Sequence, residues 1–140
     1  MAFFVDANVV VYTATGGPMQ QACAEVLDAV VEGAEGRTST AVLEEVWHLE
    51  LSRRAGDLPG LTRSAYAVFT PLLSVTDEVV ARALTLEADG LGANDRIHVA
   101  TCLENGIETV VSADADFDLV EGLRRVDPLD RRGLARLLRG

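Results

Sequence analysis

The chain has 140 residues, a hydrophobic content of 49% and a formal net charge of −10, a composition typical of a globular protein that buries a core. All 12 of its basic side chains are arginine, which excludes reactions that need a catalytic lysine, such as Schiff-base chemistry. The first apolar run ends at Asp6, and glycine and proline interrupt the uncharged span 7–24, so neither a signal peptide nor a membrane helix is expected.

These features predict one cytoplasmic domain over residues 1–140. Cys23 and Cys102 lie in apolar stretches without metal-binding spacing, and we expect them to be small buried side chains. Residues 124–140 hold six Arg against Asp127 and Asp130, so an Arg-rich C-terminal tail, about 129–140, could contact an anionic partner.

Strand and helix patterns alternate along the chain. Helix starts are expected at Gly17, Thr40, Thr76 and Asn94, where capping or turn residues precede amphipathic runs. The predicted helices cover 18–31, 40–55, 61–70, 77–88 and 95–104, with a turn or short helix at 114–120. The predicted strands cover 3–6, a short segment ending at 39, 72–75, 108–112 and 123–126. Strands separated by helices indicate an α/β fold, a three-layer α/β/α sandwich with a central parallel sheet.

Five acidic residues lie where such a sheet would gather them. Asp6 ends the first strand, and Asp114 and Asp116 follow the strand at 108–112. Glu45 lies one turn into its helix, and Asp95 lies in the first turn of another. Because ligands bind at the carboxyl ends of parallel strands, these side chains are expected to share one pocket.

A pocket of carboxylates requires neutralisation. Mutual repulsion would raise the carboxyl pKa values or loosen the fold unless divalent cations bind there. Oxygen ligands select Mg²⁺ or Mn²⁺ over Zn²⁺. Two such ions suit phosphodiester hydrolysis, because they activate water and stabilise the leaving oxygen.

Four segments in order resemble the PIN-domain nucleases, and in particular VapC-type toxins of toxin–antitoxin pairs. They read FFVDANVVVY, TSTAVLEEVWHL, NDRIHVATCLENG and VVSADADFDLV, and the resemblance extends from about residue 3 to 128. It implies a metal-dependent endoribonuclease with one or two Mg²⁺ or Mn²⁺ ions.

The resemblance also implies the roles of individual residues. An acidic quartet would bind the metal: Asp6, Glu45, Asp95 and Asp114. Asp116 would be an added ligand, and the polar residues Asn8 and Ser112 would support the site. Glu44 is the alternative to Glu45, and the spacing from Ser39 favours Glu45.

The partners implied by this family are RNA, an antitoxin protein that covers the acidic pocket, and a second copy of the chain in a homodimer. Arg53, Arg54, Arg96 and the tail are candidates for positioning the RNA backbone. The loop 13–17 is a candidate border of the site.

Other interpretations compete with these. His48 and His98 follow Glu45 and Asp95 at helical spacing and could bind zinc, although packed or hydrogen-bonded histidines are the commoner outcome. The aromatic residues Trp47, Tyr66 and Phe69 suit core or interface packing better than base stacking.

Asp118 is expected to be a turn residue that hydrogen-bonds its own backbone, beside a buried Phe117. Two other function classes stay open: a non-catalytic module that binds a protein or cation through the acidic pocket, and a receiver-type phosphotransfer domain, which the missing lysine disfavours.

Overall fold

The computed structural model describes residues 1–140. Its elements in chain order are β1 (Phe3–Val5), α1 (Ala7–Thr15), α2 (Gln20–Val31), β2 (Gly36–Arg37), α3 (Thr40–Ser52), α4 (Leu61–Phe69), α5 (Asp77–Leu84), α6 (Ala93–Glu104), β3 (Thr109–Val111), the 3₁₀ helix η1 (Ala115–Leu119), β4 (Arg124–Val126) and α7 (Arg131–Arg139). None of the helices combines the length and apolar character needed to cross a membrane.

The four strands form one parallel sheet in the order β2-β1-β3-β4. The predicted α/β fold with a central parallel sheet is therefore confirmed. The chain leaves β1 toward β2 on one side and returns to β3 on the other, so β1 and β3 flank the point where the strand order reverses. Ligands of open parallel sheets bind in the crevice at such a point, beyond the carboxyl ends of the strands.

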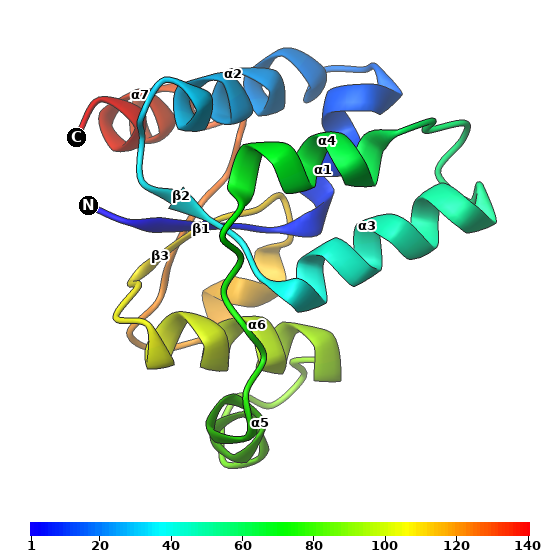
Figure 1. The fold of residues 1–140 in the computed structure, drawn as a ribbon. Coiled ribbons are helices and arrows are strands. Elements are labelled where there is room, and N and C mark those ends of the chain that lie inside the picture. The colour runs from blue at the N-terminus through cyan, green and yellow to red at the C-terminus, as the bar shows by residue number, and fades with distance from the viewer.

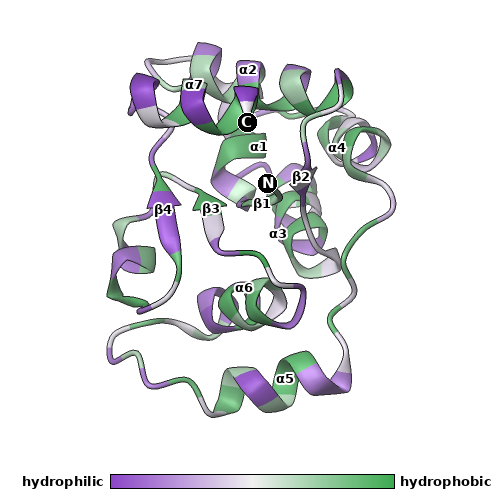
Figure 2. Ribbon diagram, turned by 90° about the vertical axis from the view of Figure 1, so that its left-hand side faces the viewer, coloured by the Kyte–Doolittle hydropathy of each residue, from purple (hydrophilic) through white to green (hydrophobic).

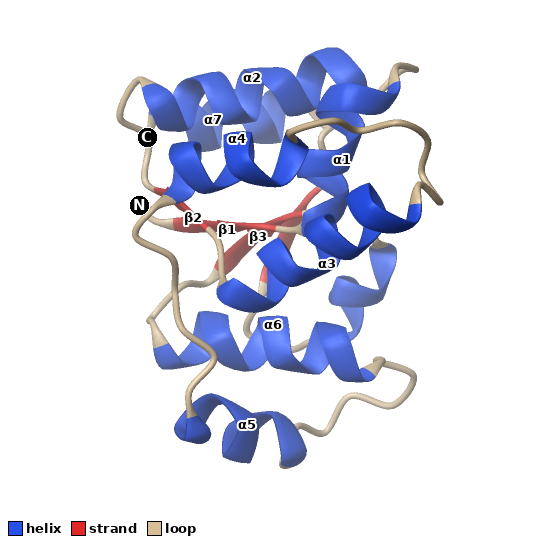
Figure 3. Cartoon of the chain, turned by 45° about the vertical axis from the view of Figure 1, so that its right-hand side comes forward, coloured by secondary structure: helices blue, strands red, loops and turns tan.

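Helices cover both faces of this sheet (Figures 1 and 3). Helices α1, α2, α4 and α7 lie on one face, α6 lies on the other, and α5 packs against the outside of α6. Helix α3 lies beyond the end of β2 and contacts α1, α4 and α6. Helix α3 therefore brings its side chains to the carboxyl edge of the sheet.

The central strands owe their position to their apolar sequence. All three residues of β1 and all three of β3 are buried, as expected of strands covered on both faces. The edge strand β4 begins with two arginines, and Figure 2 shows it as hydrophilic. One apolar core of 31 buried residues extends from β1 to α7, and a smaller cluster of Val79, Ala83 and Ala100 joins α5 to α6.

Helix α1 is an element that the sequence patterns did not predict. The apolar run after Asp6 continues directly as a helix, with Asp6 as N-cap. The segment 13–17, expected as a loop, is helical as far as Thr15. Valine favours strands intrinsically, but here Val9, Val10 and Val11 are buried in the apolar core, and tertiary packing outweighs that preference.

One predicted strand is wrong, and the C-terminal tail, for which no helix or strand was predicted, forms a helix. No strand forms over 72–75, where Leu73 makes only an isolated parallel bridge to Ser39. The Arg-rich tail is a helix, α7, which buries Leu134 and Leu137 and exposes its arginines to solvent.

The helix caps also differ in detail. Ser39, not Thr40, caps α3 by accepting a hydrogen bond from the Val42 amide. Helix α2 begins at Gln20, after the expected Gly17 cap, and α6 follows Gly92 instead of Asn94. The Thr76 cap of α5 is confirmed, since its hydroxyl accepts from the Val79 amide.

Candidate metal centre

Asp6 lies at the carboxyl end of β1 and is almost fully buried. Its Oδ1 accepts a hydrogen bond from the Ala7 amide at 2.8 Å. Its Oδ2 accepts from Ser112 Oγ at 2.7 Å and from Asn8 Nδ2 at 3.1 Å. Three donors thus fix the orientation of this carboxylate, two of them from the residues expected to support it.

A hydrogen-bond network ties the ends of β1 and β3 together. Asn8 Nδ2 also contacts Ser112 Oγ at 3.0 Å, and Asn8 Oδ1 accepts from the Ala113 amide at 3.2 Å. The Asp114 amide donates to Ser112 Oγ at 3.0 Å. The register that pairs Val5 with Val111 places Asp6 beside Ser112, so this network follows directly from the strand pairing.

Glu45 reaches the same edge from α3. Its Oε1 lies 2.8 Å from His98 Nε2, and that nitrogen is 3.9 Å from Asp6 Oδ1. A carboxylate only accepts hydrogen bonds, so His98 donates from Nε2. Glu44 is exposed, lines a neighbouring pocket with His48, and lies outside the pocket that contains Asp6.

The third group of acids comes from α6 and the turn after β3. Asp114 caps η1, and its Oδ1 accepts from the Asp116 amide at 2.9 Å. Carboxylate oxygens of Asp95, Asp114 and Asp116 lie within 4.8 Å of one another, as do ligand atoms of Asp6, Glu45 and His98. A cavity of about 310 Å³ is lined by acids from four elements: Asp6, Glu45, Asp95 and Asp114.

Two of these carboxyl groups have raised pKa values. Burial, with the charges of Asp6 and Asp114, raises the pKa of Asp95 to about 6. Burial also raises the pKa of Asp6, although the hydrogen bond from Ser112 opposes the shift. A bound cation would favour the ionised forms of both carboxyl groups and so offset the effects of burial and of repulsion.

His98, which the sequence interpretation considered either as a zinc ligand or as a packed or hydrogen-bonded residue, is buried and hydrogen-bonded. Its ring is buried beside Phe4, with centroids 5.7 Å apart, and Nδ1 has no hydrogen-bond partner. Burial lowers the pKa of His98, but the hydrogen bond and charge of Glu45, with the charges of Asp6 and Asp95, raise it above its ordinary value. The helical spacing of Asp95 and His98 was the sequence signal for this placement.

The donor set fits a hard cation. All four acids that line the cavity offer oxygen, which Mg²⁺ and Mn²⁺ prefer. The only histidine in the cluster uses Nε2 to bind Glu45, and His48 lies elsewhere, so the alternative of a histidine-based zinc site is disfavoured.

Several other candidate residues have structural contacts. Arg96 donates to the backbone carbonyls of Leu86, Ala88 and Leu91 at 2.8 to 2.9 Å, and therefore holds the segment before α6. Its expected role in positioning RNA is not supported by this geometry. Arg53 and Arg54 are exposed at the end of α3.

Asp118 does not hydrogen-bond its own backbone as expected. Its two oxygens accept from Arg125 Nε and Nη2 at 3.0 and 3.1 Å, a bidentate pair on the surface. Phe117 is fully buried, as predicted.

Among the aromatic candidates, Phe69 belongs to the core, whereas Trp47 and Tyr66 are exposed and line an apolar pocket between α3 and α4. Both cysteines are buried and free.

Comparison with known proteins places this chain in a family. The PIN domain family matches residues 3–123. Ribonuclease VapC13 of Mycobacterium tuberculosis is 27% identical over 135 residues, which cover 87% of this chain and 97% of that protein.

Two solved structures share the fold. A toxin–antitoxin complex from Klebsiella pneumoniae superposes with a TM-score of 0.67 at 20% identity, over 91% of this chain and 98% of that one. VapC20 of Mycobacterium tuberculosis, described as a sarcin-ricin loop cleaving toxin, superposes with a TM-score of 0.65 at 18% identity. The superposition covers 84% of this chain and 93% of that one. With a family match over most of its length and the acidic cluster at the expected edge of the sheet, the chain belongs to the PIN domain family.

Proposed function

We propose that this protein is a metal-dependent endoribonuclease that hydrolyses RNA phosphodiester bonds. The observation that carries the proposal is the cavity in which Asp6, Glu45, Asp95 and Asp114 meet from four different elements. The similarity to a protein named ribonuclease VapC13 supports RNA as the substrate. We extend the proposal to the whole chain, residues 1–140, as one nuclease domain.

Each residue of the cluster has a role in this proposal. The four cavity acids would hold Mg²⁺ or Mn²⁺, and Asp116 would add a ligand from the rim, where it lies beside Asp95 and Asp114. The bound ion would lower the pKa of a coordinated water and neutralise charge on the phosphate. Asn8 and Ser112 would keep Asp6 in a fixed orientation through the hydrogen bonds that they donate.

The chain is further proposed to be the toxin of a toxin–antitoxin pair. One structure that shares its fold is a toxin–antitoxin complex, which supports a protein partner here. Because the cavity is lined with carboxylates, a basic segment of the antitoxin is the complementary occupant. Toxin, antitoxin and RNA would meet in the cytoplasm.

A homodimer formed through helices completes the proposal. Light scattering on the eluate of a size-exclusion column at micromolar concentration should give twice the mass of one chain. A mass of one chain at all accessible concentrations would contradict the dimer and leave the nuclease proposal intact.

The experiment that tests the nuclease is cleavage of a panel of structured RNAs by partner-free protein with Mg²⁺, Mn²⁺ or EDTA. Wild type should cut only with metal, and Asp6→Asn should lose at least about a hundred-fold in rate, because it removes a charged ligand without changing the side-chain shape. Glu44→Gln is the matched control, since it removes an exposed acid from the same edge and should cut normally.

Two results would contradict this assignment. Cleavage by Asp6→Asn at the wild-type rate would remove the acidic cluster from the mechanism. No cleavage by folded, partner-free wild type under any metal would favour the non-catalytic binding module.

A further inference from the structure

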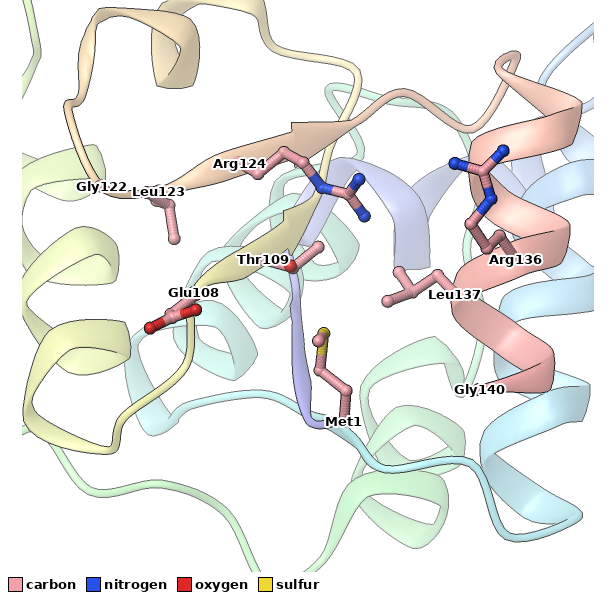
Figure 4. A pocket seen from close by; sticks show the side chains of 9 residues that line it. All are labelled: Met1, Glu108, Thr109, Gly122, Leu123, Arg124, Arg136, Leu137 and Gly140. Atoms are coloured by element: carbon pink, nitrogen blue, oxygen red, sulfur yellow. The ribbon is translucent and has the colours of Figure 1, made fainter.

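A second cavity lies at the opposite edge of the sheet from the acidic cluster. It has a volume of about 740 Å³ and opens between the amino ends of β3 and β4 and the last turns of α7 (Figure 4). Thr109 and Arg124, the first residues of the two strands, are paired in register, and both line the cavity. Cavities of this size accommodate small organic ligands.

Two arginines give this cavity a positive wall. Arg124 extends from β4 and Arg136 from α7, and both line the space between the two elements in Figure 4. Neither side chain takes part in a hydrogen bond or an ion pair, whereas Arg82 and Arg125 are paired with acids. In a chain with a net charge of −10, two unpaired guanidinium groups at one cavity are available for an external anion.

The rest of the lining is of mixed character. Leu123 and Leu137 contribute apolar surface, and both are largely buried, with exposed fractions of 6% and 7%. Glu108 lines the cavity on the side away from Arg136 (Figure 4). A carboxylate there repels a purely anionic ligand but accepts hydrogen bonds from hydroxyl or amino groups.

We propose that this cavity binds a nucleoside 5′-monophosphate. The phosphate contacts Arg124 and Arg136, the base lies against Leu123 and Leu137, and ribose hydroxyls or a base amino group donate to Glu108. A ligand with one anionic end, an apolar body and hydrogen-bond donors matches the three parts of the lining. The ligand is either a free mononucleotide or the 5′-phosphorylated end of an RNA fragment.

The proposal is tested by titrating the full chain with adenosine 5′-monophosphate in EDTA, by calorimetry and by NMR of the leucine methyl groups. We expect a dissociation constant below about 1 mM and shifts at Leu123 and Leu137. Adenosine without phosphate should bind at least about tenfold more weakly, because it forms no charge-assisted bonds to arginine.

Matched double variants identify the binding residues. Arg124→Ala with Arg136→Ala should weaken binding at least about tenfold, whereas Arg131→Ala with Arg132→Ala should leave it unchanged. Both pairs remove two exposed arginines, so their effects on net charge are equal. Equal weakening by both pairs, equal affinity for adenosine, or no binding at millimolar concentration would each overturn the proposal.

A further comparison identifies the source of the ligand. A pentaribonucleotide with a 5′-phosphate that binds as well as the mononucleotide, while its 5′-hydroxyl form does not, indicates RNA ends. Preference for the free nucleotide indicates a small-molecule ligand. Because these titrations use EDTA, their outcome is independent of the nuclease activity.

Discussion

At the scale of single residues, the acidic cluster is a set of charges that the protein itself does not neutralise. Asp6 accepts three hydrogen bonds, and still its burial raises its pKa. Asp95 forms no ion pair, because the neighbouring Arg96 donates to backbone carbonyls, and burial raises the pKa of Asp95 to about 6. The ionised forms of these groups are therefore disfavoured in the metal-free protein.

This produces a pH dependence of the free energy of unfolding. The folded-state pKa of Asp95, about 6, exceeds its ordinary 3.8, so the folded protein binds more protons and loses stability as pH rises from about 4 to about 6. The raised pKa of His98 continues the loss in the same direction at higher pH. Thermal unfolding in EDTA should show a smaller decline across this range for Asp95→Asn than for wild type.

An identical decline in wild type and Asp95→Asn would contradict this assignment. The comparison separates Asp95 from Glu50 and Asp118, whose lowered pKa values act in the opposite direction.

His98 acts on the cluster through Glu45. The imidazole is buried, and its Nε2 donates to Glu45 Oε1 at 2.8 Å. Groups that hydrogen-bond a metal-binding side chain orient it, and their loss commonly lowers metal affinity. His98 is therefore a positioning residue for Glu45 in the proposed site.

His98→Leu should lower Mn²⁺ affinity about ten- to hundred-fold, because Glu45 loses its donor. His98→Gln should lower it less, because the amide can still donate. Calorimetric titration with Mn²⁺ measures both, with circular dichroism as the control for folding. If both folded variants bind Mn²⁺ as wild type does, Glu45 does not depend on His98.

At the scale of elements, α7 is part of the fold and not a tail. Leu134 and Leu137 belong to the main apolar core, and the arginines of the helix are exposed to solvent. Helix α7 also contacts α2. Leu134 and Leu137 are three residues apart, a spacing that places both on one face of a helix, but the density of arginines obscures this in the sequence.

Leu134→Ala should lower the free energy of unfolding by about 2 to 4 kcal/mol, through lost burial and the cavity left behind. Arg132→Ala, on the exposed face of the same helix, should change it by no more than about 0.5 kcal/mol. Denaturation with guanidinium chloride measures both values. Equal, small effects would mean that α7 is not required for folding.

At the scale of the whole molecule, acidic and basic side chains gather at opposite edges of the sheet. Acids from β1, α3, α6 and η1 converge at the carboxyl edge of the sheet, and unpaired arginines lie at the amino edge. Since the net charge is −10, a divalent cation bound at the acidic edge would reduce repulsion within the fold as well as serve the proposed reaction.

Mn²⁺ should therefore stabilise the protein. A concentration one hundred times the dissociation constant adds about 2.7 kcal/mol, which raises the midpoint of thermal unfolding by several degrees. Glu44→Gln should retain this increase and Asp114→Asn should lose most of it. Scanning calorimetry with Mn²⁺ and with EDTA measures the difference; an equal increase in all three proteins would place the ion elsewhere.

Much of the fold was predictable because its signals are local. The buried strands at 3–5 and 109–111 and the Thr76 cap follow from neighbouring residues. A central parallel sheet follows from the alternation of strands with helices, but the expected strand at 72–75 is not part of it. Helix α1 was missed because a run of valines has no local feature that distinguishes a buried helix from a strand.

The sequence by itself determined which acids end the strands and begin the helices, and so which residues are candidates for a metal site. Only the tertiary structure decided that Asp6 lies beside Ser112, that Glu45 rather than Glu44 faces the cavity, and that His98 binds Glu45. These contacts join residues far apart in the chain, and they depend on the strand order and register of the sheet. Strand order and register are set by the packing of the whole core, because no local sequence signal specifies which strands become neighbours.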